Sequence, residues 1–108
     1  MIPLEKNQSL EDIQQYVADM EIERGFSERP VVEQCLQLGE EVGELFKAVR
    51  KSEGMRLDPN STVGAVGEEL ADVLIYLCSI ATRHGIDLAE ALRDKEALNE
   101  TRTWVATV

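Results

Sequence analysis

The amino-acid sequence predicts an all-α protein with four helices in one domain. Apolar residues recur at helical spacing in four stretches, and capping or turn-forming residues separate these stretches. A chain of 108 residues is long enough for one core but not for two. Hydrophobic residues make up 44% of the chain and aromatic residues 5%, so we expect a single domain over 1–108 with a mainly aliphatic core.

The first two predicted helices begin at capping residues. Ser9, with Asp12 three positions later, forms a capping box before a helix whose apolar pattern stops near Gly25. Ser27, with a proline in the first turn, opens a second helix that we expect over 28–51. On its helical wheel, one continuous apolar arc is expected, with Glu41 at its border. The arc comprises Val31, Val32, Cys35, Leu38, Leu45, Phe46 and Val49.

The third predicted helix is apolar on nearly every side. After a loop over 52–60, Asn60 or Ser61 is the expected N-cap, and the helix runs to about His84. The stretch 70–81 is interrupted mainly by one aspartate and a few small polar groups. Because a helix that is hydrophobic all round is buried all round, we expect another subunit to supply part of this burial.

The net charge limits the classes of partner and location. At −10, the chain lacks the basic surface that unaided binding to DNA, RNA or an anionic membrane requires. No basic segment followed by an apolar run stands near the first residue, and no stretch is long and apolar enough to span a membrane. We therefore expect a cytoplasmic protein. Residues 1–8 and 103–108, the latter with Trp104, are expected to be flexible or to dock at an interface.

The two cysteines predict buried, reduced thiols. Cys35 and Cys78 both fall within apolar helical patterns, and the chain has no CxxC motif. His84 is the only histidine that could accompany them. This composition disfavours a disulfide or a zinc site.

Acidic residues stand three positions apart in two of the predicted helices. Glu41 and Glu44 share one face of the second helix, and Glu69 and Asp72 share one face of the third. Solvation accounts for most acidic helix residues, including Glu40. It does not account for Asp72, because an unpaired carboxylate in a buried helix costs roughly several kcal/mol unless it is protonated, hydrogen-bonded or bound to a cation.

A shared divalent cation would relieve the repulsion between these carboxylates. Oxygen ligands without His or Cys favour Mg²⁺, or Mn²⁺, over zinc. A structural Ca²⁺ site is an alternative. A ferritin-like di-iron centre is disfavoured, because it uses Glu-x-x-His pairs and His84 does not follow a glutamate by three residues.

A cationic stripe is predicted on the fourth helix. Asp87, with a glutamate three positions later, predicts a helix from Leu88, and the inward line of this helix changes from apolar to cationic at Lys95, Asn99 and Arg102. Taken alone, this cationic stripe is typical of an ordinary surface helix with charge pairs. Beside a Mg²⁺ site it favours phosphate binding, because Mg²⁺ keeps positions open for substrate phosphates.

The spacing of the acidic residues resembles a known family. Glu40-Glu41-x-x-Glu44, followed after 24 residues by Glu69-x-x-Asp72, resembles the EExxE…ExxD signature of the MazG-type all-α nucleoside triphosphate pyrophosphohydrolases. That superfamily includes dimeric dUTPases and phosphoribosyl-ATP pyrophosphohydrolases. The run from Lys95 to Arg102 followed by a Trp is similar to the tail of small single-domain MazG-like proteins. The resemblance covers roughly residues 9–104.

This resemblance implies an assembly, a reaction and a set of site residues. The fold would be a bundle of about four helices per subunit, assembled as a homodimer or as a dimer of dimers (homotetramer), with active sites near the subunit interfaces. The enzyme would hydrolyse NTPs or dNTPs to the monophosphate and pyrophosphate with Mg²⁺, or Mn²⁺, and would remove surplus nucleotides. The implied metal ligands are Glu41, Glu44, Glu69 and Asp72. The implied catalytic carboxylates are Glu40, Glu41 and Glu44, and the implied phosphate ligands are Lys95, Asn99 and Arg102.

Two alternatives compete with this function. One is a narrower hydrolase, such as a dUTPase, a dCTPase or an enzyme that acts on a phosphoribosyl nucleotide. The other is a catalytically silent helical bundle that binds a nucleotide or a protein partner. A panel of nucleotides with Mg²⁺ separates the three, because they differ in selectivity and in whether any product forms.

Overall fold

Four α-helices make up the regular structure of residues 3–103, the part of the chain that the computed structural model describes, and no strand occurs there. They are α1 (Leu10–Arg24), α2 (Val31–Ser52), α3 (Val66–Arg83) and α4 (Leu88–Asn99). The prediction of an all-α fold with four helices is therefore confirmed. Trp104, which was expected to lie in a flexible or docking tail, falls outside the described residues.

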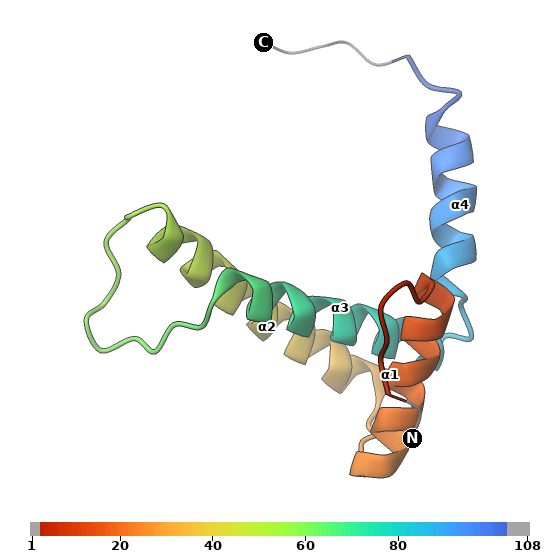
Figure 1. Ribbon diagram of the computed structural model, residues 1–108, viewed down its shortest axis with the longest axis horizontal. Helices are drawn as coiled ribbons and strands as arrows, with labels where there is room; N and C mark the ends of the chain where they lie inside the picture. The colour runs from red at the N-terminus through yellow and green to blue at the C-terminus, as the bar shows by residue number, and fades with distance from the viewer. Residues whose placement is uncertain (1–2, 104–108) are drawn as a thin grey trace.

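The helices form a hairpin, a crossing helix and a projecting arm. α2 and α3 run antiparallel and pack along each other, α1 packs across the C-terminal half of α3, and α4 contacts α1 and extends away from the hairpin (Figure 1). The core lies at the crossing of α1 and α3, where Val17, Met20 and Cys78 are buried and Ile13 and Ile75 pack against them. The hairpin beyond this crossing therefore depends on contacts between α2 and α3 alone.

Local hydrogen bonds explain most of the helix boundaries. Ser9 and Asp12 form both bonds of the predicted capping box. Gly25 ends α1 with φ +78°, a left-handed conformation that glycine adopts without steric cost. At the start of α4, the Asp87 carboxylate accepts hydrogen bonds from the backbone N–H groups of Ala89 and Glu90, as the capping prediction requires.

The predicted starts of α2 and α3 are wrong by a few residues. α2 begins at Val31, because Pro30 has an extended backbone and acts as the N-cap. α3 begins at Val66 and not after Asn60 or Ser61. Both of those backbone N–H groups bond to Asp58, so they close a turn, and the chain then runs without regular structure to the N-cap Ala65.

The predicted apolar arc of α2 is only partly covered within the described chain: Val31, Leu38 and Leu45 are half-buried, and the other four members are exposed. Within the arc, Val32 is 66% and Phe46 is 63% exposed. Outside the arc, Leu36 of α2 and Leu70, Leu74 and Leu77 of α3 are also exposed. Cys35 is exposed too, which corrects the prediction that both thiols are buried; Cys78 is fully buried, and both are free thiols. The residues of α2 that do become buried are Gln34 and Ala48. The hairpin thus buries one polar and one small apolar residue of α2 and leaves the exposed part of its apolar arc without a partner among the described residues.

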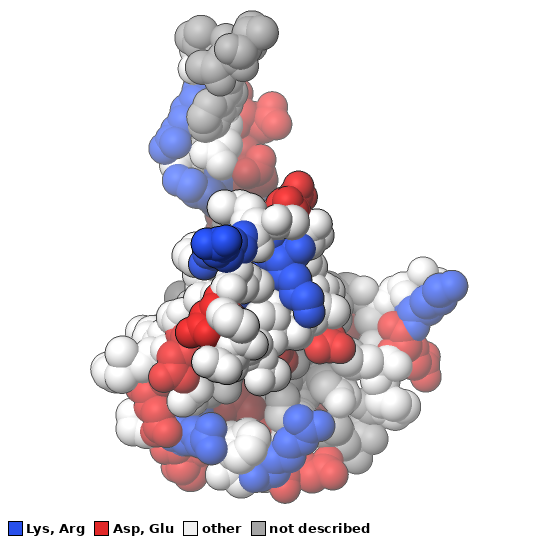
Figure 2. Space-filling view, turned by 90° about the vertical axis from the view of Figure 1, so that its left-hand side faces the viewer, with Lys and Arg blue, Asp and Glu red and all other residues white. Residues whose placement is uncertain are grey.

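The surface charge is mixed. Acidic and basic side chains alternate on the face drawn in Figure 2, and no broad basic area covers that face. This distribution agrees with the net charge of −10. None of the helices in residues 3–103 is long and apolar enough to cross a membrane.

Candidate metal centre and nucleotide site

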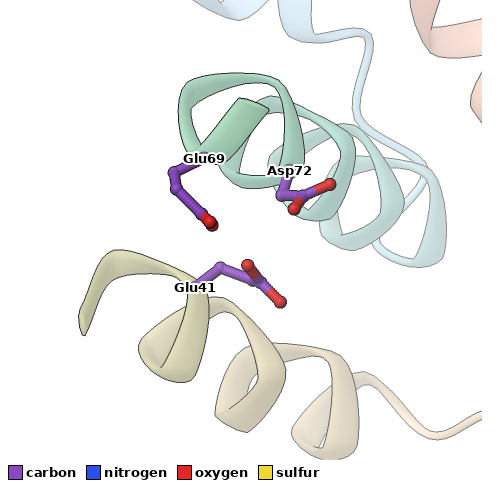
Figure 3. Close-up of side chains that lie close together, drawn as sticks. All are labelled: Glu41, Glu69 and Asp72. Atoms are coloured by element: carbon purple, nitrogen blue, oxygen red, sulfur yellow. The ribbon is translucent and has the colours of Figure 1, made fainter. Parts of the chain in front are cut away.

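Three carboxylates from two helices converge between α2 and α3. Glu41 comes from α2, Glu69 and Asp72 come from successive turns of α3, and one oxygen of each lies within 4.8 Å of the others. Figure 3 shows the three side chains directed into the space between the two helices. We call these three residues the acidic cluster.

The three carboxylates of the acidic cluster are partly buried, and their negative charges repel each other. Glu69 is only 9% exposed, and Glu41 and Asp72 are half-buried. Burial raises the pKa of Glu41 above its ordinary value, and the negative charges of Asp72 and Glu69 raise this pKa further. Among residues 3–103, the ion pairs are Lys47–Glu44 and Arg83–Glu21, and neither includes a residue of the acidic cluster. Closely spaced oxygen donors that repel each other fit a hard divalent cation such as Mg²⁺.

The backbone before α3 helps to hold Glu69. Gly64 lies so close to the Glu69 carboxylate that a Cβ atom at this position would collide with Oε1, and it would also contact Oε2 of Glu68 at 3.3 Å. Gly67, one turn further on, has no such neighbour within 4 Å. The absence of a side chain at Gly64 thus lets the irregular segment 61–65 cover Glu69.

The other two acidic residues of the predicted site lie outside the acidic cluster. Glu44 is half-buried, and its Oε1 is 3.5 Å from Nζ of Lys47, a long and largely exposed ion pair. Glu44 is still near enough for its charge to contribute to the raised pKa of Glu41. Glu40, the neighbouring residue of α2, is exposed. The structure therefore brings together three of the four predicted metal ligands.

The cationic stripe lies far from the acidic cluster within one chain. Lys95, Asn99 and Arg102 are on or just after α4, which follows the C-terminus of α3, whereas the acidic cluster is near the N-terminus of α3 (Figure 1). The side chain of Asn99 donates to Glu96 Oε1 at 2.9 Å. The structure does not unite the stripe with the carboxylates of its own chain.

A cavity of about 190 Å³ lies beside the acidic cluster. It includes two carboxylates of the cluster and continues toward the turn that joins α1 to α2. Its lining includes Phe26, Arg29, Gln34, Glu41, Asp72 and Tyr76. Two hollows of about 260 Å³ lie elsewhere along α1, but neither contains a residue of the acidic cluster. Of these three spaces, the cavity of about 190 Å³ is therefore the one that adjoins the acidic cluster.

Burial and the charge of Glu41 raise the pKa of the Tyr76 hydroxyl in this cavity. Tyr76 thus remains protonated at neutral pH and can donate a hydrogen bond. Arg29 stacks on Phe26, with its guanidinium carbon 4.1 Å from the ring centroid. The cavity therefore offers an aromatic wall, a hydroxyl and a cation beside the carboxylates.

A buried arginine ties the walls of this cavity together. Arg83 of α3 lies 2.8 Å from Glu21 of α1, and both side chains are largely buried. Its guanidinium also donates to the backbone oxygens of Phe26 and Arg29, each at 2.8 Å, and to Ser79 Oγ at 2.6 Å. Arg83 therefore fixes the α1–α2 turn against the C-terminal half of α3.

Comparison with known proteins identifies the family. The MazG nucleotide pyrophosphohydrolase domain matches residues 32–102, which contain the whole acidic cluster. The chain belongs to this family. MazG membership confirms the resemblance that the spacing of the acidic residues indicated.

Curated MazG relatives act on deoxynucleotides. The chain is 33% identical over 96 residues to a dATP/dGTP diphosphohydrolase of Salmonella phage PMBT28 (89% of this chain, 28% of the relative). It is 37% identical over 68 residues to a protein of the same name from Cyanophage S-2L (63% and 52%), and 35% identical over 99 residues to mouse dCTP pyrophosphatase 1 (87% and 58%). The chain thus spans between about a quarter and three-fifths of the lengths of these relatives.

Solved structures support the MazG fold. Two crystal structures of iMazG from Vibrio DAT 722 superpose with a TM-score of 0.66 at 30% and 29% identity. The matches cover 87% and 89% of this chain and 100% and 98% of the iMazG chains.

Most residues that line the cavity beside the carboxylates could not be recognised from the sequence. Arg29 lies in a turn, Gln34 belongs to no motif, and Arg83 sits at the end of a helix. Only Gln34 had a usable signal, because on the helical wheel it falls near Glu41. The contacts among α1, the turn and α3 depend on tertiary packing and leave no pattern in the sequence.

Proposed function

We propose that this MazG-family chain is a Mg²⁺-dependent pyrophosphohydrolase of nucleoside triphosphates, with deoxynucleotides as its main substrates. The convergence of Glu41, Glu69 and Asp72 beside a cavity is the observation that carries this proposal. The relatives named as dATP/dGTP diphosphohydrolases and a dCTP pyrophosphatase support a deoxynucleotide substrate. The same enzyme would serve to remove surplus nucleotides.

In the proposed reaction, water cleaves the bond between the α- and β-phosphates and yields a monophosphate and pyrophosphate. A divalent ion held by the acidic cluster would neutralise phosphate oxygens and leave positions for water and substrate. A carboxylate of the site accepts the proton of the attacking water. Glu40 and Glu44, one turn apart on the same helix, are candidates to accept this proton or to orient the water, and Glu44 is also a candidate fourth ligand.

A nucleotide panel tests this proposal. Pyrophosphate release from the four dNTPs and four NTPs is measured with Mg²⁺, Mn²⁺ and Ca²⁺. We expect turnover of at least one dNTP with Mg²⁺ and a loss of about 100-fold or more in Glu41→Gln. Glu33→Gln, the same change at an exposed position of α2, serves as the control and retains activity. Folded wild-type protein that releases no product from any nucleotide would refute the proposal.

We further propose that the active sites form between two or more copies of the chain. The exposed apolar arc of α2 and the exposed leucines of α3 supply a surface for a second copy. Because the cationic stripe cannot reach the acidic cluster of its own chain, it would act on phosphates bound to a partner's cluster.

Mixing two inactive variants tests this shared site. Lys95→Met removes a cation from the stripe, and Asp72→Asn damages the acidic cluster. If the site is shared, mixed oligomers of the two variants regain part of the activity that each variant lacks. Sedimentation of a monomer at working concentration, or no recovery after mixing under exchange conditions, would contradict the shared site.

A further inference from the structure

One buried amide beside the acidic cluster has an unused hydrogen-bond acceptor. Gln34 is 3% exposed, and its Nε2 donates to Ser79 Oγ at 2.9 Å. Its Oε1 is shielded from solvent and has no hydrogen-bond partner among the described residues. Buried polar atoms are nearly always paired, so an orphan acceptor at a cavity indicates that a ligand supplies the donor.

Gln34 and its unpaired acceptor belong to the wall of the cavity beside the acidic cluster. Gln34 lines the same cavity as Glu41 and Asp72, together with Phe26 and Tyr76. At about 190 Å³, this space is smaller than the roughly 300–1,000 Å³ of pockets that enclose whole ligands. It suits a single ring system with one apolar face and polar edges, and not a complete nucleotide.

The amide of Gln34 is held in place by a buried polar network. Ser79 Oγ, which binds Nε2 of Gln34, also accepts a hydrogen bond from Arg83 Nη1 at 2.6 Å. Arg83 is fixed in turn by its ion pair with Glu21 and by the backbone of the α1–α2 turn. Ser79 is therefore a positioning residue: it engages the donor side of the Gln34 amide and leaves the acceptor Oε1 unpaired.

We propose that Gln34 selects the nucleobase of the substrate by accepting a hydrogen bond from an exocyclic amino group. The inference rests on the proposed function, since it assumes that the triphosphate lies at the acidic cluster. Adenine and cytosine carry such an amino donor, whereas thymine and uracil present a carbonyl oxygen at the corresponding position. A carbonyl oxygen of thymine or uracil would face Oε1 of Gln34, and two acceptors cannot form a hydrogen bond. Because Oε1 would then stay buried and unpaired, binding of such a base would be much weaker.

Binding, measured separately from turnover, tests the role of Gln34. Isothermal titration uses the non-hydrolysable α,β-imido analogues of dATP, dCTP and dTTP with Mg²⁺. We expect the wild type to bind the dATP or dCTP analogue at least about tenfold more tightly than the dTTP analogue. In Gln34→Leu, we expect this ratio to fall close to one, mainly through weaker binding of the amino-bearing analogue.

Two further variants make the test specific. Ser79→Ala releases the amide, so the ratio is expected to fall although Gln34 is still present. This variant also provides the test if Gln34→Leu does not fold, as judged by its thermal melt. Gln15→Leu makes the same substitution at an exposed glutamine of α1, whose side chain donates to Asp19 of the same helix, and is expected to keep the wild-type ratio.

The outcomes separate this inference from the proposed function. Equal binding of all three analogues by the wild type, tighter binding of the dTTP analogue, or an equal loss for all three in Gln34→Leu would overturn the role of Gln34. Discrimination that depends on Gln34 but is accompanied by no turnover of any dNTP would support the amide's role and refute the hydrolase. Absence of binding by any analogue would overturn both.

Discussion

The α2–α3 hairpin and the α4 arm both carry charged side chains along one face of a helix but place them in opposite environments. In the hairpin, Glu41 faces Glu69 and Asp72 of the opposing helix, and burial and repulsion raise its pKa. On α4, Lys95 is exposed and the arm projects away from the hairpin (Figure 1). Spacing along one helix thus identifies residues that share a face, whereas the opposing helix decides whether that face becomes a site.

The comparison also separates two sources of stability. Where the hairpin meets α1, the buried side chains of Arg83, Glu21 and Ser79 are joined by hydrogen bonds and an ion pair. The loss of one of them therefore leaves buried polar groups unpaired. On α4, charged groups are solvated and form at most local pairs, which contribute little. Substitutions in the two regions should therefore differ in both size and kind of effect.

Removal of Arg83 should produce the largest loss of stability. Arg83→Leu leaves the buried Glu21 carboxylate without its cation and frees the α1–α2 turn, at a cost of about 3–5 kcal/mol in the free energy of unfolding. Arg93→Leu on the exposed face of α4 should change it by no more than about 0.5 kcal/mol. Urea unfolding of both variants measures the difference. Similar stabilities would show that the buried network does not hold the fold.

A methyl group at Gly64 should weaken the metal site more than the fold. In Gly64→Ala, the new Cβ would displace the flexible end of Glu69 from the acidic cluster, and we expect Mg²⁺ affinity to fall by about tenfold. Gly67→Ala is the matched control, because its Cβ meets no atom within 4 Å. If the two variants bind Mg²⁺ equally well, close packing of segment 61–65 on Glu69 is not important for the site.

The raised pKa of Glu41 should make the stability of the metal-free protein depend on pH, an effect smaller than those of the two substitutions above. Because its pKa is raised above the ordinary 4.5, the metal-free folded protein binds more protons than the unfolded chain between these two values. The stability contributed by protonated Glu41 is therefore complete below pH 4.5 and is lost as the pH rises through the raised pKa. Glu41→Gln should lack this loss, and the metal-free wild type should become less stable relative to the variant as the pH increases.

Thermal melts of the two proteins from pH 4 to pH 8, with EDTA or with Mg²⁺, measure this difference. Mg²⁺ should stabilise the wild type at neutral pH more than it stabilises Glu41→Gln. A constant difference across the pH range would show that Glu41 is not strained in the folded state.

The sequence predicted the helices better than their starting points. The capping residues Ser9 and Asp87 were sufficient for α1 and α4, because these side chains bond to the nearest backbone groups. The start of α3 was predicted too early, because Asp58 binds the backbone of Asn60 and Ser61 in a turn, and Ala65 offers no side-chain cap. A helix that begins without a polar cap leaves no local signal.

The candidate site was predicted in part. Helical spacing and the cost of burying Asp72 led to the acidic cluster, since both are local properties of α2 and α3. The surroundings of the cluster could not be predicted. The amide nitrogen of Gln34 bonds to Ser79, which leaves the amide oxygen without a partner among the described residues. Arg83 bonds to Glu21 of α1, which is 62 positions away in the sequence.

The dependence of pyrophosphate release on Mg²⁺ tests the central claim most directly, with one aspartate changed in each of the two regions. Asp72→Asn alters the acidic cluster, and Asp94→Asn makes the same change on the exposed α4 arm. We predict that Asp94→Asn keeps the Mg²⁺ dependence of the wild type, whereas Asp72→Asn loses about 100-fold or more in kcat/KM and requires more Mg²⁺. Equal activity and equal Mg²⁺ dependence in the two variants would contradict the account.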